Sequence, residues 1–188
     1  MELSKNEQER LARHRAARIH GFKKIVIWIA VIAIIGAAIY GLVWLSKKAA
    51  MNKPGEAIPE LSRDHIPVGS PRPQYNSNPP TSGPHYPESA AWGVYDKTLP
   101  DEQLLHNLEH GGIWISYKDA GDKDLADQLK SLASKYTLKV IMEPRPADDS
   151  RIAVAAWGRL LKLDHFDKQQ IRDFINAYIN RGPEDVPY

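Results

Sequence analysis

The stretch "HNLEHGGIWISY", residues 106–117, decides the fold because it places a helix end, a glycine turn and a strand in direct succession. The helix is predicted to begin in "TLPDE" at 98–102, where a capping threonine, an early proline and two acids form a start signal. Gly111 stands where glycine commonly ends helices, so the helix is expected to run to about His110. The β-branched and aromatic residues at 113–117 then predict a strand.

Helical and strand periodicities alternate further along the chain. Leucines at helical spacing predict an amphipathic helix over 122–136. "LKVIM" at 138–142 predicts a strand, and after a turn or loop "IAVAAW" at 152–157 predicts a second, buried one. Asp167 is expected to cap a last helix, with Gln170 in the reciprocal capping position. Together these elements predict one small α+β domain with a short helix followed by β-α-β-β-α order.

A proline-rich stretch, "YNSNPPTSGPHYP" at 75–87, precedes these elements. Its tyrosines, asparagines and His85 give it more hydrogen-bonding and aromatic capacity than a disordered linker has, so we expect a rigid loop wrapped over the domain. An ordinary coil with a chance histidine is the alternative. Residues 92–95 are expected to form a short strand or an extended docking segment.

An uncharged apolar run, "IVIWIAVIAIIGAAIYGLVWL" at 25–45, is long enough to cross a bilayer core of about 30 Å. Lys and Arg are in excess before it, which predicts a cytoplasmic basic arm at 1–24. A linker at 46–64 and an extracytoplasmic α+β domain at 65–188 are then expected. A cleaved signal peptide is the competing hypothesis, but its apolar region is usually shorter, about 7–15 residues.

The composition excludes several classes of function. The formal net charge of +2 gives no support for nucleic-acid binding. The absence of cysteine excludes disulfides, thiolate metal ligands and a cysteine nucleophile. The chain also lacks a glycine-rich phosphate loop and a serine elbow, and we do not expect an enzyme.

The short helix carries two leucines and two histidines on opposite sides. At 100° per residue, Leu104 and Leu108 share the face expected to pack on the core. His106 and His110 then point to solvent or to a covering loop, and two imidazoles four residues apart can share one metal ion. The alternative is that both histidines are exposed and bind no metal ion.

His85 from the proline-rich loop would complete three nitrogen ligands with this histidine pair. Met142, at the end of its strand, is a candidate for a soft fourth ligand and otherwise a core residue. Three histidines with a methionine suit copper, whereas zinc would be satisfied by three histidines and water. Glu109 and Tyr86 are expected to contact the ligands rather than the metal.

The pattern His-x-x-Glu-His also occurs in zinc peptidases, where the glutamate activates water. That class needs a long helix and a further ligand downstream. Here the helix is expected to end at Gly111, and Glu184 in the Gly/Pro-rich tail is a conceivable third ligand. A zinc peptidase is therefore the least favoured of three hypotheses, and the other two are given below.

Four motifs, "YNSNPPTSGPHYP", "HNLEHGGIWISY", "AAWGRLLKLD" and "RGPEDVP", resemble the bacterial membrane-anchored domain-of-unknown-function family 3105 over roughly residues 65–188. The resemblance implies one extracytoplasmic domain on a single anchor, with motif histidines at His85, His106 and His110. It also implies a methionine at Met142, although members often carry a second one where this chain has Glu143.

Two hypotheses of function follow. In the first, the chain is a membrane-anchored, extracytoplasmic metal-binding protein for copper, with zinc as the alternative, which holds, delivers or senses the ion in the cell envelope and has an envelope protein partner. In the second, it is a non-enzymatic, membrane-tethered interaction module without metal. The histidines then only hydrogen-bond the proline-rich loop, and Tyr75, Tyr86 and Trp92 form the partner surface.

Overall fold

The computed structural model describes residues 27–45 and 53–184, which belong to two separate units. The first unit contains a helix at Ile27–Leu45 with a mean hydropathy of 2.4, long and apolar enough to cross a membrane. The apolar run is thus helical wherever it is described. The expected arm at 1–24 and the first part of the linker, 46–52, lie outside the described residues.

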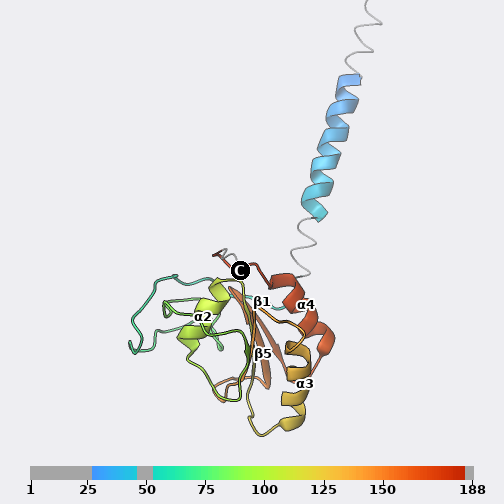
Figure 1. The fold of residues 1–188 in the computed structure, drawn as a ribbon. Coiled ribbons are helices and arrows are strands. Elements are labelled where there is room, and N and C mark those ends of the chain that lie inside the picture. The colour runs from blue at the N-terminus through green and yellow to red at the C-terminus, as the bar shows by residue number, and fades with distance from the viewer. Residues whose placement is uncertain (1–26, 46–52, 185–188) are drawn as a thin grey trace, which may run out of the picture. The chain divides into compact units, whose positions relative to one another are not determined.

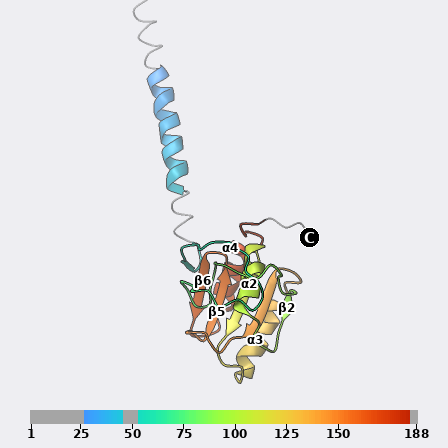
Figure 2. The same cartoon turned by 90° about the vertical axis from the view of Figure 1, so that its left-hand side faces the viewer.

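The second unit is a three-layer α+β structure. Within the described residues 53–184, six strands form one mixed sheet in the order β1-β6-β5-β3-β4-β2. Helix α2 and the proline-rich loop cover one face, and α3 and α4 cover the other (Figures 1 and 2). The strands are β1 Glu56–Ala57, β2 Gly93–Val94, β3 Ile113–Tyr117, β4 Val140–Pro144, β5 Ile152–Ala156 and β6 Arg159–Leu163. The helices are α2 Asp101–Glu109, α3 Lys123–Ala133 and α4 Lys168–Tyr178.

The sheet has an apolar core on each face, because successive side chains of a strand point to opposite sides. In β3, Ile113 and Ile115 pack with α3 and α4, while Trp114 packs with α2. β3 lies between β4, to which it is parallel, and β5, to which it is antiparallel. Burial on both faces explains the near-continuous apolar runs of the central strands.

The α+β class and the wrapping loop are confirmed, but the order is β-α-β-β-β-α, with one strand, β6, that was not predicted from the sequence. β6 pairs antiparallel with β5 through a turn at Gly158, whose φ of +66° favours glycine. Its sequence "RLLKL" has mixed burial, so it carries little strand periodicity. The segment at 92–95 does contain a strand, β2, at the edge beside β4.

Strand β4 begins and ends later than expected. Leu138, assigned to the strand, precedes it and is 49% exposed, while the expected turn residues Glu143 and Pro144 belong to the strand. Parallel pairing with β3 extends the strand, since Pro144 lies opposite Tyr117. The N-cap of α2 is Pro100 and not Thr98, whose hydroxyl donates to the Pro144 carbonyl oxygen.

The chain joins the domain earlier than the linker assignment of 46–64 implied. β1, within that range, pairs with β6, and the Tyr178 hydroxyl donates to the Pro54 carbonyl oxygen. The Leu61 amide donates to the Ser82 hydroxyl in the proline-rich loop. The described residues from Lys53 onward are therefore part of the compact unit.

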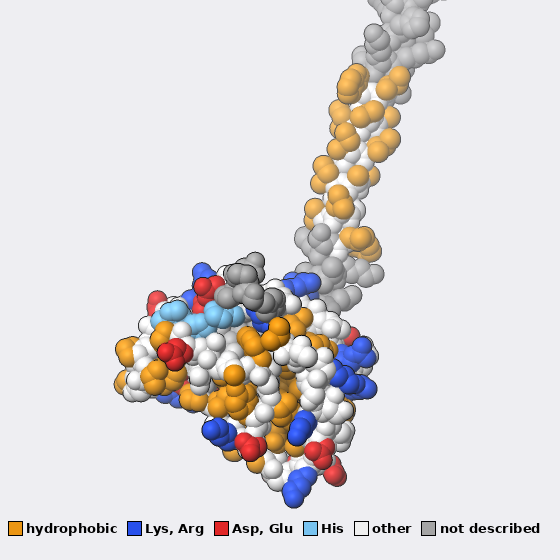
Figure 3. Space-filling model, viewed as in Figure 1, with side chains coloured by type: hydrophobic (Ala, Val, Ile, Leu, Met, Phe, Trp, Pro, Cys, Tyr) orange, Lys and Arg blue, Asp and Glu red, His pale blue; other side chains and the backbone are white. Residues whose placement is uncertain are grey.

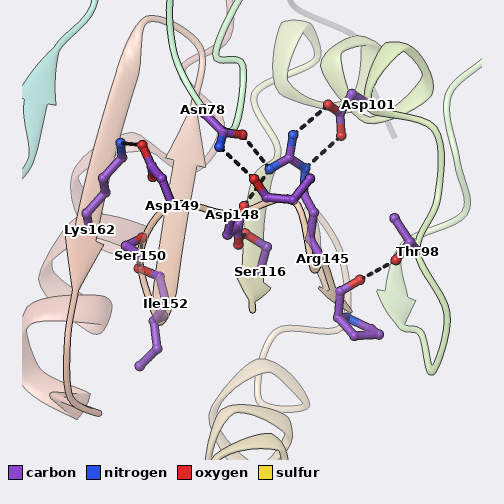
Figure 4. Close-up of polar contacts among 12 residues, drawn as sticks. Asn78, Thr98, Asp101, Ser116, Arg145, Asp148, Asp149, Ser150, Ile152 and Lys162 are labelled. Carbon is purple, nitrogen blue, oxygen red and sulfur yellow. Dashed lines mark hydrogen bonds and ion pairs between the residues drawn. The ribbon is translucent and has the colours of Figure 1, made fainter. Parts of the chain in front are cut away.

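A buried guanidinium joins α2, the proline-rich loop and the segment after β4 (Figure 4). Arg145 is 1% exposed and forms a two-pronged pair with Asp101 at the first turn of α2, with distances of 2.8 and 2.7 Å. The same guanidinium donates to Asp148 and to Asn78, each at 2.6 Å. Planar, two-pronged pairing of this kind fixes orientation as well as distance.

Glu143, two residues before Arg145, is fully buried. One carboxylate oxygen accepts from the Leu99 amide at 2.6 Å, just before α2. Burial raises the pKa of Glu143 to about 8, and the Asp101 carboxylate adds to the rise. A side-chain hydrogen bond from Trp114 also acts on this carboxyl group and opposes the rise of its pKa.

We expect Arg145→Met to lower the free energy of unfolding by about 3–5 kcal/mol, because it leaves buried carboxylates without their partner. Arg151→Met is the matched control, since Arg151 pairs with Asp122 near the surface. Its loss should be much smaller. Urea unfolding of the full chain in detergent, followed by tryptophan fluorescence, measures both. Equal losses would contradict a special role for Arg145.

We expect Glu143→Gln to gain stability relative to the native chain as the pH rises. The folded-state pKa of about 8 exceeds the unfolded value, so the carboxyl group's contribution is complete below pH 4.5 and is lost as the pH rises toward 8. The difference should grow by up to about 1.4 kcal/mol per pH unit within that window. Unfolding at pH 5 and pH 8, with chelator present, tests this. A difference that does not vary with pH would refute it.

Candidate metal centre

Hydrogen bonds within the proline-rich loop and from it to the rest of the domain hold the loop in place. The Tyr75 hydroxyl donates to the Pro84 carbonyl oxygen at 2.8 Å, and the Asn78 amide donates to the Ala147 carbonyl oxygen at 2.7 Å. His85, near the end of the loop, is fully buried. Its backbone forms an isolated parallel bridge with His65, which brings a second histidine to the same place.

Helix α2 presents its histidines to this loop. Leu104 and Leu108 are buried in the core against the sheet, and His106 is buried on the other side. The loop rather than solvent covers His106, whose Nδ1 lies 2.8 Å from the Tyr86 carbonyl oxygen. Asn107 secures the helix further through paired hydrogen bonds to the backbone of Ala90.

Four side chains, which we call the inner set, converge between the loop and α2: His65, His85, His106 and Glu109. One ligand atom from each lies within 4.8 Å of the others. The Glu109 Oε2 atom is 3.0 Å from His85 Nε2 and 3.8 Å from His65 Nε2. Ligands about 2.0–2.1 Å from a tetrahedral ion stand roughly 3.3 Å apart. The inner set therefore has the spacing to hold one metal ion.

Hydrogen bonds to backbone carbonyls fix the ring orientation of two of these histidines. The His85 Nδ1 atom donates to the Gly83 carbonyl oxygen and the His106 Nδ1 atom donates to the Tyr86 carbonyl oxygen, each at 2.8 Å. A carbonyl oxygen only accepts, so Nδ1 carries a proton in both rings. In a neutral ring Nε2 then holds the lone pair that binds a metal.

The contact between His85 and Glu109 requires a positive species. With Nδ1 protonated, a neutral His85 would direct its Nε2 lone pair at a carboxylate oxygen only 3.0 Å away. Both groups are buried, so water does not relieve the repulsion. Either a proton or a metal ion between the two atoms makes this arrangement favourable.

Burial lowers the pKa of His106, and the positive charges that His110, His85 and His65 would carry lower it further. The hydrogen bond to the Tyr86 carbonyl oxygen opposes this shift. The neutral ring, which is the form that binds metals, is therefore favoured at neutral pH.

A second group, which we call the outer set, consists of His106, His110 and Glu184. The Nε2 atoms of His106 and His110 are 3.0 Å apart, and His110 Nε2 is 3.2 Å from the Glu184 carboxylate. The tail carrying Glu184 passes tightly over the end of α2. A Cβ atom at Gly182 would lie 2.0 Å from the Glu109 carbonyl oxygen, so glycine is required there.

A hollow of about 390 Å³ is lined by residues of both sets, namely His65 and Glu109 of the inner set and Glu184 of the outer set, together with Arg63, Asp64 and Pro183. Figure 3 shows histidine side chains gathered on the surface over α2 with acidic groups beside them. His65 is 48% and Glu184 52% exposed, whereas His85 and Glu109 are buried. The candidate centre is therefore open to solvent on one side.

The structure unites most of the residues expected at the site but not Met142. Met142 is buried on the opposite face of the sheet, in the core with α3 and α4. Tyr86 lies beside the candidate ligand His106, which it contacts through its backbone oxygen. Glu109 lies among the candidate ligands themselves instead of behind them. His65 was not identified, because its approach depends on a bridge between distant segments that no local spacing signals.

Comparison with known proteins bears on the chain's family. Searches of the curated proteins and of the solved structures found no match. A family model described as protein of unknown function (DUF3105) matches residues 70–187. The match covers more than half of the chain and includes His85, His106, His110, Glu109 and Glu184. It confirms the resemblance carried by the sequence motifs, and the chain belongs to the DUF3105 family.

Proposed function

We propose that the domain binds a transition-metal ion through His65, His85, His106 and Glu109. One observation carries the proposal: His85 and His106 each donate Nδ1–H to a backbone carbonyl and stand in one group with the Glu109 carboxylate, so Nε2 is the nitrogen that each ring has left to bind an ion. Histidines that bind metals commonly have their other ring nitrogen held in this way.

The donor set favours a divalent ion. Three imidazoles and a carboxylate suit copper(II) or zinc(II), and copper(II) binds such sites more tightly in the usual order of divalent metals. The sulfur of Met142, the kind of soft ligand that copper(I) prefers, is on the other face of the sheet. We therefore propose copper(II), with zinc(II) as the alternative.

We propose that the domain works in the cell envelope, anchored by the helix at Ile27–Leu45. The excess of Lys and Arg before this helix supports a cytoplasmic N-terminus and an extracytoplasmic domain. An anchored domain with an ion near its surface suits metal holding, delivery to an envelope protein, or sensing.

A metal-free interaction module is the second candidate, and the His85–Glu109 contact also supports it. A proton on His85 would make the contact a buried ion pair that fastens the proline-rich loop to α2. This module would keep its loop in place without any metal. The zinc-peptidase hypothesis is less favoured: Glu184 reaches His110, but Glu109, the residue needed to activate water, contacts His85.

Metal loading of the full chain in detergent tests the proposal. Chelator-treated protein is given copper(II) or zinc(II), desalted, and its metal content is measured by elemental analysis. We expect one tightly bound ion per chain, and we expect His106→Ala and His85→Ala to lose it. His165→Ala, an exposed histidine outside both sets, and Met142→Leu should retain it. Failure of the native chain to bind, or retention by His106→Ala, would overturn the proposal.

The orientation can be measured because the chain has no native cysteine. We expect a membrane-impermeant maleimide to label Ser131→Cys, at an exposed position of α3, in intact spheroplasts. Ser4→Cys, in the basic arm, should be labelled only after permeabilisation. The reverse pattern would show the opposite orientation, and labelling of neither variant in permeabilised cells would show that the probe fails.

A further inference from the structure

The inner and outer sets share His106, and they share the same atom of it. The Nδ1 atom of His106 donates to the Tyr86 carbonyl oxygen, which leaves only Nε2 for either set. One nitrogen lone pair binds one ion at a time. The two sets are therefore alternative positions for a single ion, not the two halves of a dinuclear centre.

The two positions differ in the strength and the accessibility of their ligands. The inner set offers four donor groups, of which His85, His106 and Glu109 are buried. The outer set offers three, and its carboxylate, from Glu184, is 52% exposed. An ion should bind more tightly in the inner position and exchange more readily in the outer one.

The outer set is built into the fold. The Glu184 amide donates to the Glu109 carbonyl oxygen at 3.1 Å, and the Asn180 amide donates to the Gly111 carbonyl oxygen at 2.8 Å. These bonds attach the tail to the end of α2 and bring the Glu184 carboxylate within 3.2 Å of His110 Nε2. Glu184 and Glu109 line the same hollow, so the two carboxylates open onto one space.

We propose that the outer set is a transfer position through which a divalent transition-metal ion enters and leaves the inner set. This inference rests on the proposed metal binding and adds the path by which the ion reaches the inner set. The ion is captured by His110 and Glu184 with His106, and His106 stays bound while the outer ligands are exchanged for His65, His85 and Glu109. No free ion forms, and no change of oxidation state is involved.

The rates of metal uptake and release test this route in the full chain in detergent. Trp157, whose ring centroid lies 6.0 Å from that of His85, provides a fluorescence signal that bound copper(II) quenches. Glu184→Gln and His110→Asn should still bind one copper(II) ion. Their uptake, and their release to a strong chelator, should be slower by about tenfold, because a capturing charge or ligand is missing.

Two variants complete the design. Glu88→Gln removes an exposed carboxylate outside both sets and should leave both rates unchanged. His65→Asn removes the exposed ligand of the inner set, and we expect it to weaken equilibrium binding by at least about tenfold while capture remains fast. Circular dichroism of each variant establishes that it is folded.

The outcomes separate the route from the binding itself. If the native chain binds no ion, the proposed function fails and the route fails with it. If the native chain binds one ion but Glu184→Gln and His110→Asn exchange it at the native rate, the route is wrong and the binding proposal stands. If these two variants lose the ion while His65→Asn keeps it, the ion rests in the outer set and the assignment of the two positions is overturned.

Discussion

The arrangement of the candidate centre depends on the buried guanidinium of Arg145. It fixes the first turn of α2 through Asp101 and the proline-rich loop through Asn78, so it sets the distance between the two segments that supply His106 and His85. A buried cation needs its carboxylates as much as they need it, which makes the junction sensitive to the loss of any partner. The histidines meet because this junction holds the two segments together at the opposite end of α2.

The sequence predicts what depends on local periodicity. The leucine and histidine faces of α2 follow from helical spacing, and the layer architecture follows from apolar runs with their caps, such as Asp167 on α4. Features set by the pairing of one strand with another were not predictable. β6 is a strand because β5 lies beside it, and Glu143 and Pro144 continue β4 because β3 lies beside them.

The same distinction between local patterns and contacts made only in the folded chain applies to the candidate centre. His85, His106 and His110 stand in recognisable motifs, and the structure places them close together. Met142 was predicted as a ligand because it lies near the end of a strand. The sequence does not show which face of the sheet its side chain is on, and in the structure that is the face with α3 and α4. His65 and Glu184 come from outside the central motifs, and only the folded chain brings them to α2. The sequence thus indicates a cluster of histidines, but the fold determines which side chains are the candidate ligands.

The candidate ligands span the chain from His65 to Glu184, which has a thermodynamic consequence. The centre has no counterpart in an unfolded chain, so any ion that binds there shifts the equilibrium toward the native state by mass action. A domain translocated across a membrane unfolded would take up its ion only after folding on the far side. Its folded lifetime, and hence its resistance to envelope proteases, would then report how much of that ion the compartment contains.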